Sequence, residues 1–341
     1  MSGSNQVEQL LAAWGLQARR FEKVQDVYKV ETDQGLMNLK VSPLIPKRLL
    51  FVHQAVRHLA AQGFAHMNPL IPTPDGRSYL CDDQYAYTLY RWVPGRQCDF
   101  RNRDELTRAT QILAQFHRKS AGFNPPYQSS MRNRLGKCLR QFEERRQELI
   151  EYQELAQQRR NEPFARIYLE NVEYFLPMAV KAIARLRGSA YPLLVEKAFQ
   201  EQTFCHGDPA ARNFILTPQN EIFVIDFDSC RVDLPIMDVI KFTRRVLKKH
   251  RWRTETAIQL INAYHAAAPL TPAELAVMKS VFYFPQKFWR MSTRYFHEHG
   301  RHSPERALEK FQKYLRNKKS LAQFQTEFDD YQLPMEKAYA R

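Results

Sequence analysis

The segment from residue 205 to residue 229, CHGDPAARNFILTPQNEIFVIDFDS, restricts what this chain can fold into more than any other part of it. It contains an H-G-D-x4-N loop, then two short apolar runs on either side of a Thr-Pro-Gln-Asn turn, and then an aspartate. Apolar runs that flank turn residues predict a β-hairpin. Such a hairpin would hold Asn213 just before one strand and Asp226 just after the other, with Asp208 in the loop before them.

The residue types in this segment suit phosphoryl transfer from a nucleotide. That reaction asks a protein mainly to position the reactants and to neutralise charge. Mg²⁺ prefers oxygen ligands and usually takes one or two of them from protein. We therefore expect Asp208 to act as the base for an attacking hydroxyl, and Asn213 and Asp226 to hold Mg²⁺.

Each part of this pattern has a simpler explanation when it stands alone. An aspartate after a strand is usually a cap or a turn residue, and a D-x-D such as residues 226–228 also occurs in glycosyltransferases and phosphohydrolases. Loop, hairpin and terminal aspartate together favour the phosphotransferase. We expect His206 to be structural, with its imidazole bonded to backbone carbonyls, whereas Asp228 either supports the metal or forms a turn.

The front of the chain is expected to be a small lobe rich in β-structure. Residues 27–32 alternate in polarity, residues 33–35 supply a turn, and residues 37–41 pair back. Lys40 would then lie on the strand where kinases hold their phosphate-binding lysine, although a surface lysine on an edge strand is the simpler interpretation. Residues 49–62 carry apolar side chains at helical spacing and predict a helix.

These motifs resemble the aminoglycoside phosphotransferase and choline kinase group, in which H-G-D-x4-N and a later I-D-[FWL] occur in the same order. More narrowly, residues 90–100, YRWVPGRQCDF, and residues 112–118, ILAQFHR, are similar to the CotS-like spore coat proteins of endospore-forming bacteria. The resemblance implies an α+β, bilobal protein kinase-like fold, with a small β-rich N-terminal lobe and a large, mostly helical C-terminal lobe. It also implies that ATP and Mg²⁺ are the cofactors.

Carried over residue by residue, the resemblance assigns roles to single side chains. It makes Asp208 the catalytic base, Asn213 and Asp226 the metal ligands, and Lys40 the lysine that binds the α- and β-phosphates of ATP. Asp238 would brace the catalytic loop from the start of a helix.

The two lobes are expected to meet at a short hinge. Residues 1–90 would form the N-terminal lobe, residues 91–95 the hinge, and residues 96–341 the C-terminal lobe. The backbone of Arg91, Trp92 and Val93 would present the hydrogen bonds to adenine. Tyr90 would close the back of that pocket, and His206 is also expected among the residues that bind the cofactor. In the C-terminal lobe, residues 105–120 read as a helix with Asp104 as its N-cap.

Two features depart from the family pattern. The loop near residues 22–26 contains no glycine, so its backbone has less freedom to approach phosphates closely. The predicted helix over residues 49–62 contains no acid, and Val52 stands where the family has the glutamate that pairs with the lysine. Lys40 would therefore lack its usual carboxylate or borrow one such as Asp226, which leaves room for weak, altered or absent catalysis.

Composition restricts partners and location. The net charge is +15, with denser basic stretches at 241–253 and 301–319. In the first of them Arg244, Arg245, Lys248 and Lys249 recur at helical spacing, as on a solvated helix face, and no nucleic-acid motif accompanies these stretches. No apolar run is long enough to span a bilayer, and the N-terminus lacks the apolar core of a signal peptide. The five cysteines form no C-x-x-C pair. We expect cytoplasmic synthesis, no membrane insertion, and no nucleic-acid partner.

Two functional hypotheses follow. The first is an ATP-dependent phosphotransferase that acts on a hydroxyl of a small molecule or of a coat or cell-surface precursor, with assembly into the spore coat beside other coat proteins. The second is a structural coat protein that keeps the kinase fold with little or no turnover. Retention of Asp208, Asn213 and Asp226 favours the enzyme, and the missing glycine and glutamate favour the scaffold.

Overall fold

A computed structural model of the chain describes residues 3–24, 27–125, 129, 132–297 and 303–334. Contacts between residues divide the chain into two compact units. The first unit consists of residues 1–133 and 201–232, and the second of residues 134–200 and 233–341. The lobe boundary expected at residues 91–95 stays a prediction.

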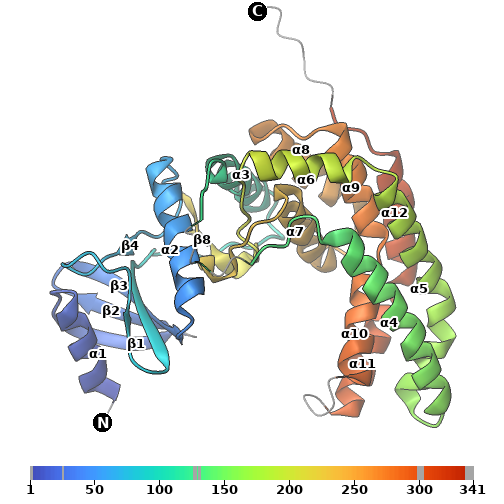
Figure 1. Cartoon of the computed structure of the whole chain (residues 1–341), viewed down its shortest axis with the longest axis horizontal. Coiled ribbons are helices and arrows are strands. Elements are labelled where there is room, and N and C mark those ends of the chain that lie inside the picture. The colour runs from blue at the N-terminus through green and yellow to red at the C-terminus, as the bar shows by residue number, and fades with distance from the viewer. Residues whose placement is uncertain (1–2, 25–26, 126–128, 130–131, 298–302, 335–341) are drawn as a thin grey trace, which may run out of the picture. The chain divides into compact units, whose positions relative to one another are not determined.

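The first unit contains an antiparallel sheet with strand order β1-β2-β3-β6-β4, in which β5 also pairs with β6 (Figure 1). A second, smaller sheet has the order β7-β8-β9 and includes the hairpin expected after the H-G-D loop. Short 3-10 turns, η1 and η2, flank that hairpin. The elements of this unit are α1 (Gly3–Ala13), β1 (Ala18–Val24), β2 (Val27–Thr32), β3 (Gly35–Pro43), α2 (Pro46–Ala61), β4 (Leu70–Ile71), β5 (Leu80–Cys81), β6 (Tyr85–Arg91), β7 (Arg96–Gln97), α3 (Arg103–Ser120), η1 (Ala211–Asn213), β8 (Phe214–Leu216), β9 (Ile222–Val224) and η2 (Phe227–Ser229).

Helix α1 covers one face of the large sheet and was not anticipated. Its buried Leu11 and the following Trp14 pack with Val30 and Leu39 of the sheet. The indole N–H of Trp14 donates to the carbonyl of Ile71 at 3.0 Å. Burial of this apolar stripe fastens the N-terminal segment to the strands that carry Lys40.

The ends of helices α3 and α2 can be compared with what the sequence predicts for them. Helix α3 is capped by Asn102, whose side chain accepts from the backbone N–H groups of Asp104 and Glu105. The expectation that Asp104 is the N-cap was therefore wrong; it lies in the first turn, where its charge favours the helix dipole. Helix α2 begins with Pro46 and is followed by Gly63 at a φ of 74°, as helix-end chemistry predicts.

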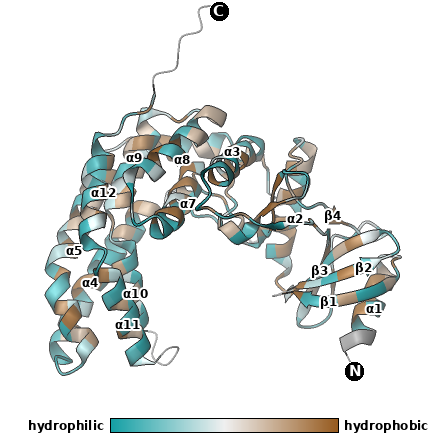
Figure 2. Cartoon of the chain, turned by 180° about the vertical axis from the view of Figure 1, so that it is seen from behind, coloured by the Kyte–Doolittle hydropathy of each residue, from teal (hydrophilic) through white to brown (hydrophobic). Residues whose placement is uncertain are grey.

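The second unit is helical, and its core is built from stacked aromatic rings. Phe288 lies 4.3 Å from Phe175 and 5.1 Å from Tyr168 between ring centroids, and Phe164 lies 4.4 Å from Phe311. Figure 2 shows α10 and α11 mostly in hydrophilic colours, so their apolar residues are confined to the faces that supply these rings. The helices of this unit are α4 (Cys138–Gln158), α5 (Pro163–Arg187), α6 (Tyr191–Gln200), α7 (Pro235–Lys249), α8 (Thr254–Ala267), α9 (Pro272–Tyr283), α10 (Gln286–Phe296), α11 (Pro304–Leu315) and α12 (Lys318–Asp330).

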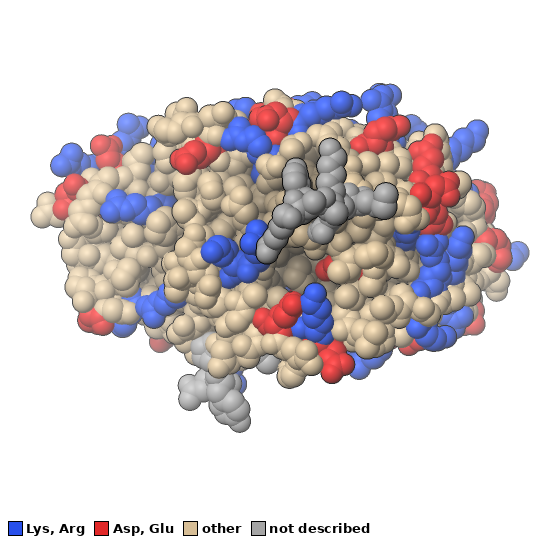
Figure 3. All heavy atoms as spheres, turned by 90° about the horizontal axis from the view of Figure 1, so that it is seen from above, with Lys and Arg blue, Asp and Glu red and all other residues tan. Residues whose placement is uncertain are grey.

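Surface properties agree with the composition. On the face drawn in Figure 3, Lys and Arg side chains are interspersed with Asp and Glu and do not merge into one continuous patch. In the described part of the chain, no helix combines the length and the apolar character needed to cross a membrane. All five cysteines lie in the described residues, and all are free thiols.

Candidate functional site

The H-G-D loop is held in place by His206 and Gly207. Nδ1 of His206 accepts the backbone N–H of Asp208 at 3.2 Å, which leaves Nε2 protonated to donate to the carbonyl of Ile225 at 3.1 Å. The imidazole thus joins the loop to the end of β9, which is the structural role expected for it. Gly207 has a φ of 80°, and a Cβ there would lie 2.0 Å from the carbonyl oxygen of Ser229. Only glycine allows this close approach of two backbones.

Asp208 is fixed by two neighbours on the same loop. Nδ2 of Asn213 donates to the backbone carbonyl of Asp208 at 2.8 Å and lies 3.4 Å from Oδ2 of Asp208. The guanidinium of Arg212 forms an ion pair with the same Oδ2. The Asp208 side chain is 12 % exposed, whereas that of Arg212 is 54 % exposed. The structure therefore places Asp208 and Asn213 together, and adds the half-exposed cation of Arg212, which the sequence analysis missed.

Asp226 has an uncommon backbone conformation. Its φ is 67° and its ψ is 71°, in the left-handed region that non-glycine residues rarely adopt. Strained conformations of this kind are typical of functional sites, because the surrounding structure must stabilise them. Asp226 lies two residues after the end of β9, so the hairpin positions its carboxylate as the sequence predicts.

Lys40 on β3 reaches both acids of the D-x-D segment. Its Nζ lies 2.7 Å from Oδ1 of Asp226 and 3.0 Å from Oδ1 of Asp228. Burial alone would lower the pKa of Lys40, but the carboxylates of Asp228 and Asp226 outweigh it and raise that pKa. Burial would raise the pKa of Asp226, but the charge of Lys40 outweighs it and lowers that pKa. Both groups are therefore charged, and Lys40 has borrowed Asp226 as anticipated.

Helix α2 contacts this cluster through a base instead of an acid. Arg48 in its first turn lies 3.3 Å from Oδ2 of Asp228, and its Nη2 also donates to the carbonyl of Asp228 at 3.0 Å. Asp228 thus joins Lys40 of the sheet to Arg48 of the helix. No signal in the sequence identified Arg48, because the pair is separated by 180 residues.

The part of α2 where the family has a glutamate is uncharged. Val52 is 3 % exposed and His53 is 3 % exposed. Burial lowers the pKa of His53 to about 4, although Asp228 acts in the opposite direction. Among the described residues, neither ring nitrogen of His53 has a hydrogen-bond partner. Lys40 is therefore paired without any contribution from this part of α2.

The backbone at the expected hinge is partly engaged within the protein. The N–H of Arg91 donates to Pro69 at 2.9 Å, and the N–H of Trp92 donates to Leu36 at 3.0 Å. Tyr90 is 5 % exposed, and burial raises the pKa of its hydroxyl. Within residues 91–93, the backbone N–H of Val93 is the one that has no partner among the described residues.

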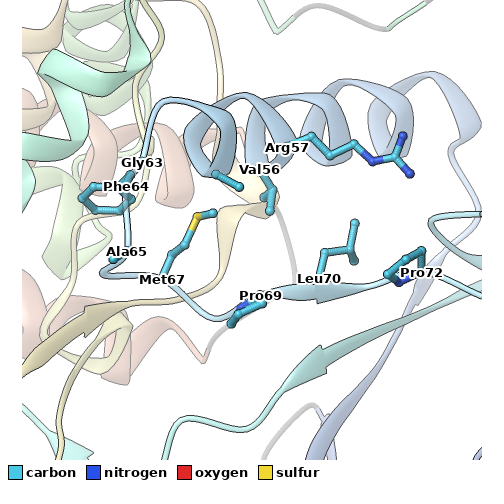
Figure 4. A pocket seen from close by; sticks show the side chains of 10 residues that line it. Val56, Arg57, Gly63, Phe64, Ala65, Met67, Pro69, Leu70 and Pro72 are labelled. Carbon is cyan, nitrogen blue, oxygen red and sulfur yellow. The ribbon is translucent and has the colours of Figure 1, made fainter.

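Asp238 and a cavity of the first unit are two further features. Asp238 is fully buried in the first turn of α7, in the second unit, and its role as a brace stays a prediction. In the first unit, a cavity of about 350 Å³ lies between α2 and the following segment, and Figure 4 shows the side chains around it. Arg57 supplies its one charged lining group, and the remaining lining residues are Val56, Ala60, Gly63, Phe64, Ala65, Met67, Pro69, Leu70 and Pro72. None of the predicted site residues lines this cavity.

Comparison with known proteins identifies the family. Residues 18–278 match the family described as "Phosphotransferase enzyme family". The chain belongs to this phosphotransferase family. Among curated relatives, spore coat protein S of Bacillus subtilis (strain 168) is 28% identical over 275 residues, which cover 79% of this chain and 77% of that protein. The resemblance to both groups is thereby confirmed.

Solved structures of other phosphotransferases share the fold. An aminoglycoside phosphotransferase from Alicyclobacillus acidocaldarius has a TM-score of 0.83 at 20% identity, over 94% of each chain. Spectinomycin phosphotransferase, solved with ADP and spectinomycin, has a TM-score of 0.63 at 12% identity, over 95% of this chain and 98% of that one. The kinase-like fold, an antiparallel sheet followed by a mostly helical part, is therefore confirmed.

Proposed function

We propose that this protein is an ATP-dependent phosphotransferase with an alcohol group as acceptor. One observation carries the proposal: within one compact unit, Lys40 meets Asp226 at 2.7 Å, while Asn213 and Asp208 are bonded to each other on the adjoining loop. Asp208 would act as the general base for the acceptor hydroxyl. Positioning of this kind, with charge neutralisation, is what phosphoryl transfer requires of a protein.

The donor set fits Mg²⁺. Asp226 offers a carboxylate and Asn213 an amide oxygen, which are the hard ligands that this cation takes from protein. Lys40 now supplies the positive charge beside Asp226 and Asp228, so the two acids are arranged around a cation. When bound, Mg²⁺ would neutralise charge on the phosphates, and Lys40 would turn from the acids to the α- and β-phosphates.

Adenine would bind at the segment that leaves β6. We propose residues 1–90 and 96–341 as the two lobes, with residues 91–95 as the hinge. The N–H of Val93 is the donor available to adenine, because those of Arg91 and Trp92 serve the sheet; the carbonyls of the segment would be the acceptors. Buried Tyr90 would close the back of this pocket. ADP in the spectinomycin phosphotransferase supports a nucleotide ligand.

The relative from Bacillus subtilis supports a place in the spore coat. Its printed name is spore coat protein S, and it matches 79% of this chain. We infer that the present protein associates with the coat, where other coat proteins are candidate partners and a coat or cell-surface hydroxyl is a candidate acceptor.

A second candidate function is a structural coat protein with the kinase fold and little turnover. The observations that favour it are the absence of an acid from α2 and of glycine from residues 18–32. Without these groups, binding of the phosphates depends on Lys40 and the metal.

Calorimetric titration of ATP, with and without Mg²⁺, tests the proposal before any acceptor is known. We expect saturable binding that requires Mg²⁺. Phosphate transfer is then measured across a panel of small-molecule and polymeric hydroxyl acceptors, with Asp208→Asn protein as the background. If the wild type binds Mg·ATP but never exceeds that background, the structural function replaces the enzymatic one. If it binds no nucleotide, the proposed site is wrong.

A further inference from the structure

Five basic side chains of the second unit gather on three helices, and we call them the basic cluster. They are Lys248 of α7, Lys287, Arg290 and Arg294 of α10, and Lys310 of α11. The three residues of α10 are spaced i, i+3 and i+7, which places them on one face of that helix. Arg290, Arg294, Lys248 and Lys310 are exposed, whereas Lys287 is partly buried.

Helices α10 and α11 pack together, and α7 is joined to the segment just before α10. The rings of Phe288 on α10 and Phe311 on α11 lie 5.5 Å apart, and Figure 1 shows these helices side by side. Arg244 of α7 donates to the carbonyl of Phe284, just before α10, at 3.3 Å. The basic side chains therefore share one region of the second unit.

The charges of the cluster repel one another. Burial and, after it, the positive charges of Lys248, Arg290, Arg294 and Lys310 together lower the pKa of Lys287 to about 8. Burial and the neighbouring Arg294 and Arg245 likewise lower the pKa of Arg290. An arrangement that gathers like charges around a partly buried amine costs folding free energy and needs a reason.

No acid of the described chain compensates these charges. Among the residues that the structure describes, no carboxylate lies within 4.0 Å of a cationic nitrogen of the cluster, although Glu305 and Glu309 belong to α11. Elsewhere in the same unit, Arg185 and Asp329 form a bidentate ion pair at 2.8 Å. The second unit therefore pairs a cation with a carboxylate elsewhere, whereas the basic cluster is available to a negatively charged ligand.

We propose that the basic cluster binds a small ligand that carries two or more phosphate groups. Two guanidinium groups and three ammonium groups on three neighbouring helices can engage several phosphate oxygens at once. Guanidinium groups favour phosphate through paired hydrogen bonds, and ammonium groups add point charges. The site lies within the second unit and does not depend on the chemistry proposed for Asp208.

The test compares two triple variants of the full-length protein. The cluster variant is Lys287→Gln, Arg290→Gln and Arg294→Gln. The control variant is Lys319→Gln, Arg166→Gln and Arg316→Gln, which removes the same charges from exposed positions of the same unit. Because both retain the first unit unchanged, any binding of the probe there contributes equally to both.

Tripolyphosphate is the probe, with orthophosphate and citrate as comparisons at equal ionic strength, and calorimetry and thermal unfolding are the measurements. We expect saturable tripolyphosphate binding by the wild type, at least tenfold weaker binding by the cluster variant, and less than a twofold change in the control. The cluster variant should unfold at the same temperature as the wild type or higher, since repulsion is relieved.

Three results would overturn the proposal. Equal loss of affinity in both variants would show a general charge effect. Citrate binding as tightly as tripolyphosphate would show that the site does not select phosphate. Absence of saturable tripolyphosphate binding by the wild type would show that the cluster is not a binding site.

Discussion

The charged groups around Lys40 and those of the basic cluster differ in how their charges are compensated. In the first unit, Lys40 faces Asp226 and Asp228, and Asp228 faces Arg48, so each charge has an opposite neighbour at 3.3 Å or less. In the second unit, Lys287 faces other cations. The first group is balanced by the protein itself and, under the proposed function, would exchange the ammonium group of Lys40 for Mg²⁺. Under the proposal above, the second is balanced when a ligand with phosphate groups binds.

The largest expected effect concerns the proposed base. Asp208→Asn should lower transfer to a true acceptor by roughly two to four orders of magnitude, the range that general-base catalysis supplies. Affinity for Mg·ATP should stay within a few-fold of wild type, since base and nucleotide act together only during transfer. Rates and calorimetric affinities check this, with Asp83→Asn, at an exposed position, as the control. Unchanged transfer would remove Asp208 from the chemistry.

The next effect tests whether the balanced group exists to hold a cation. Asp226→Asn keeps the shape of the side chain but removes its charge. It should weaken Mg²⁺-dependent ATP binding by at least roughly 100-fold, which is more than the loss of a residue that only orients a metal ligand costs. Asp226→Ala should be at least as damaging. Titrations with and without Mg²⁺ measure this. Equal affinities for wild type and both variants would mean that Asp226 serves only as a partner of Lys40.

A smaller effect is expected at the helix. Arg48→Ala breaks the link from α2 to Asp228 and should weaken Mg·ATP binding by about tenfold, the lower range for residues that orient metal ligands. Arg48→Lys should recover part of the loss because the charge returns. Arg57→Ala, on the same helix but away from Asp228, is the matched control. If Arg57→Ala and Arg48→Ala behave alike, the contribution belongs to α2 in general and not to this ion pair.

The smallest effect belongs to the second unit. The folded-state pKa of Lys287, about 8, lies below its ordinary value of 10.5. Between these values the unfolded chain binds the extra proton, so stability rises with pH over this window. The cost is fully present below pH 8, where Lys287→Met should raise Tm by roughly 2–4 °C, the shift that about 1 kcal/mol gives. Calorimetric scans from pH 7 to pH 10 should show the two proteins converging; a constant difference would contradict repulsion as the cause.

Much of the fold could be predicted because local chemistry agrees with tertiary structure. Turn residues between apolar runs located the β8–β9 hairpin, and alternation located β2 and β3. Strand β1 escaped prediction because most of its side chains are exposed, so ARRFEKV shows no apolar alternation. Helix α1 carried a signal that was overlooked, since Val7, Leu11 and Trp14 follow helical spacing.

The site was predictable where it depends on short segments and not where it depends on distant ones. The H-G-D loop, the hairpin and the reach of Lys40 to Asp226 came from motifs. The link from Arg48 to Asp228 depends on the packing of α2 against η2, which no local pattern encodes. Arg212 lies inside the motif itself, four residues after Asp208, but its spacing alone did not reveal the ion pair.

Arg212 bears on a side reaction of phosphotransferases, the hydrolysis of ATP by water. Its guanidinium donates to Oδ2 of Asp208, one of the two oxygens that could accept the proton of an incoming hydroxyl. The arginine side chain is 54 % exposed, so the ion pair is weak enough for a bound substrate to displace it. A water molecule brings no further contacts with which to offset that displacement. Under the proposed function, the arginine would therefore spare ATP from wasteful hydrolysis until the true acceptor arrives.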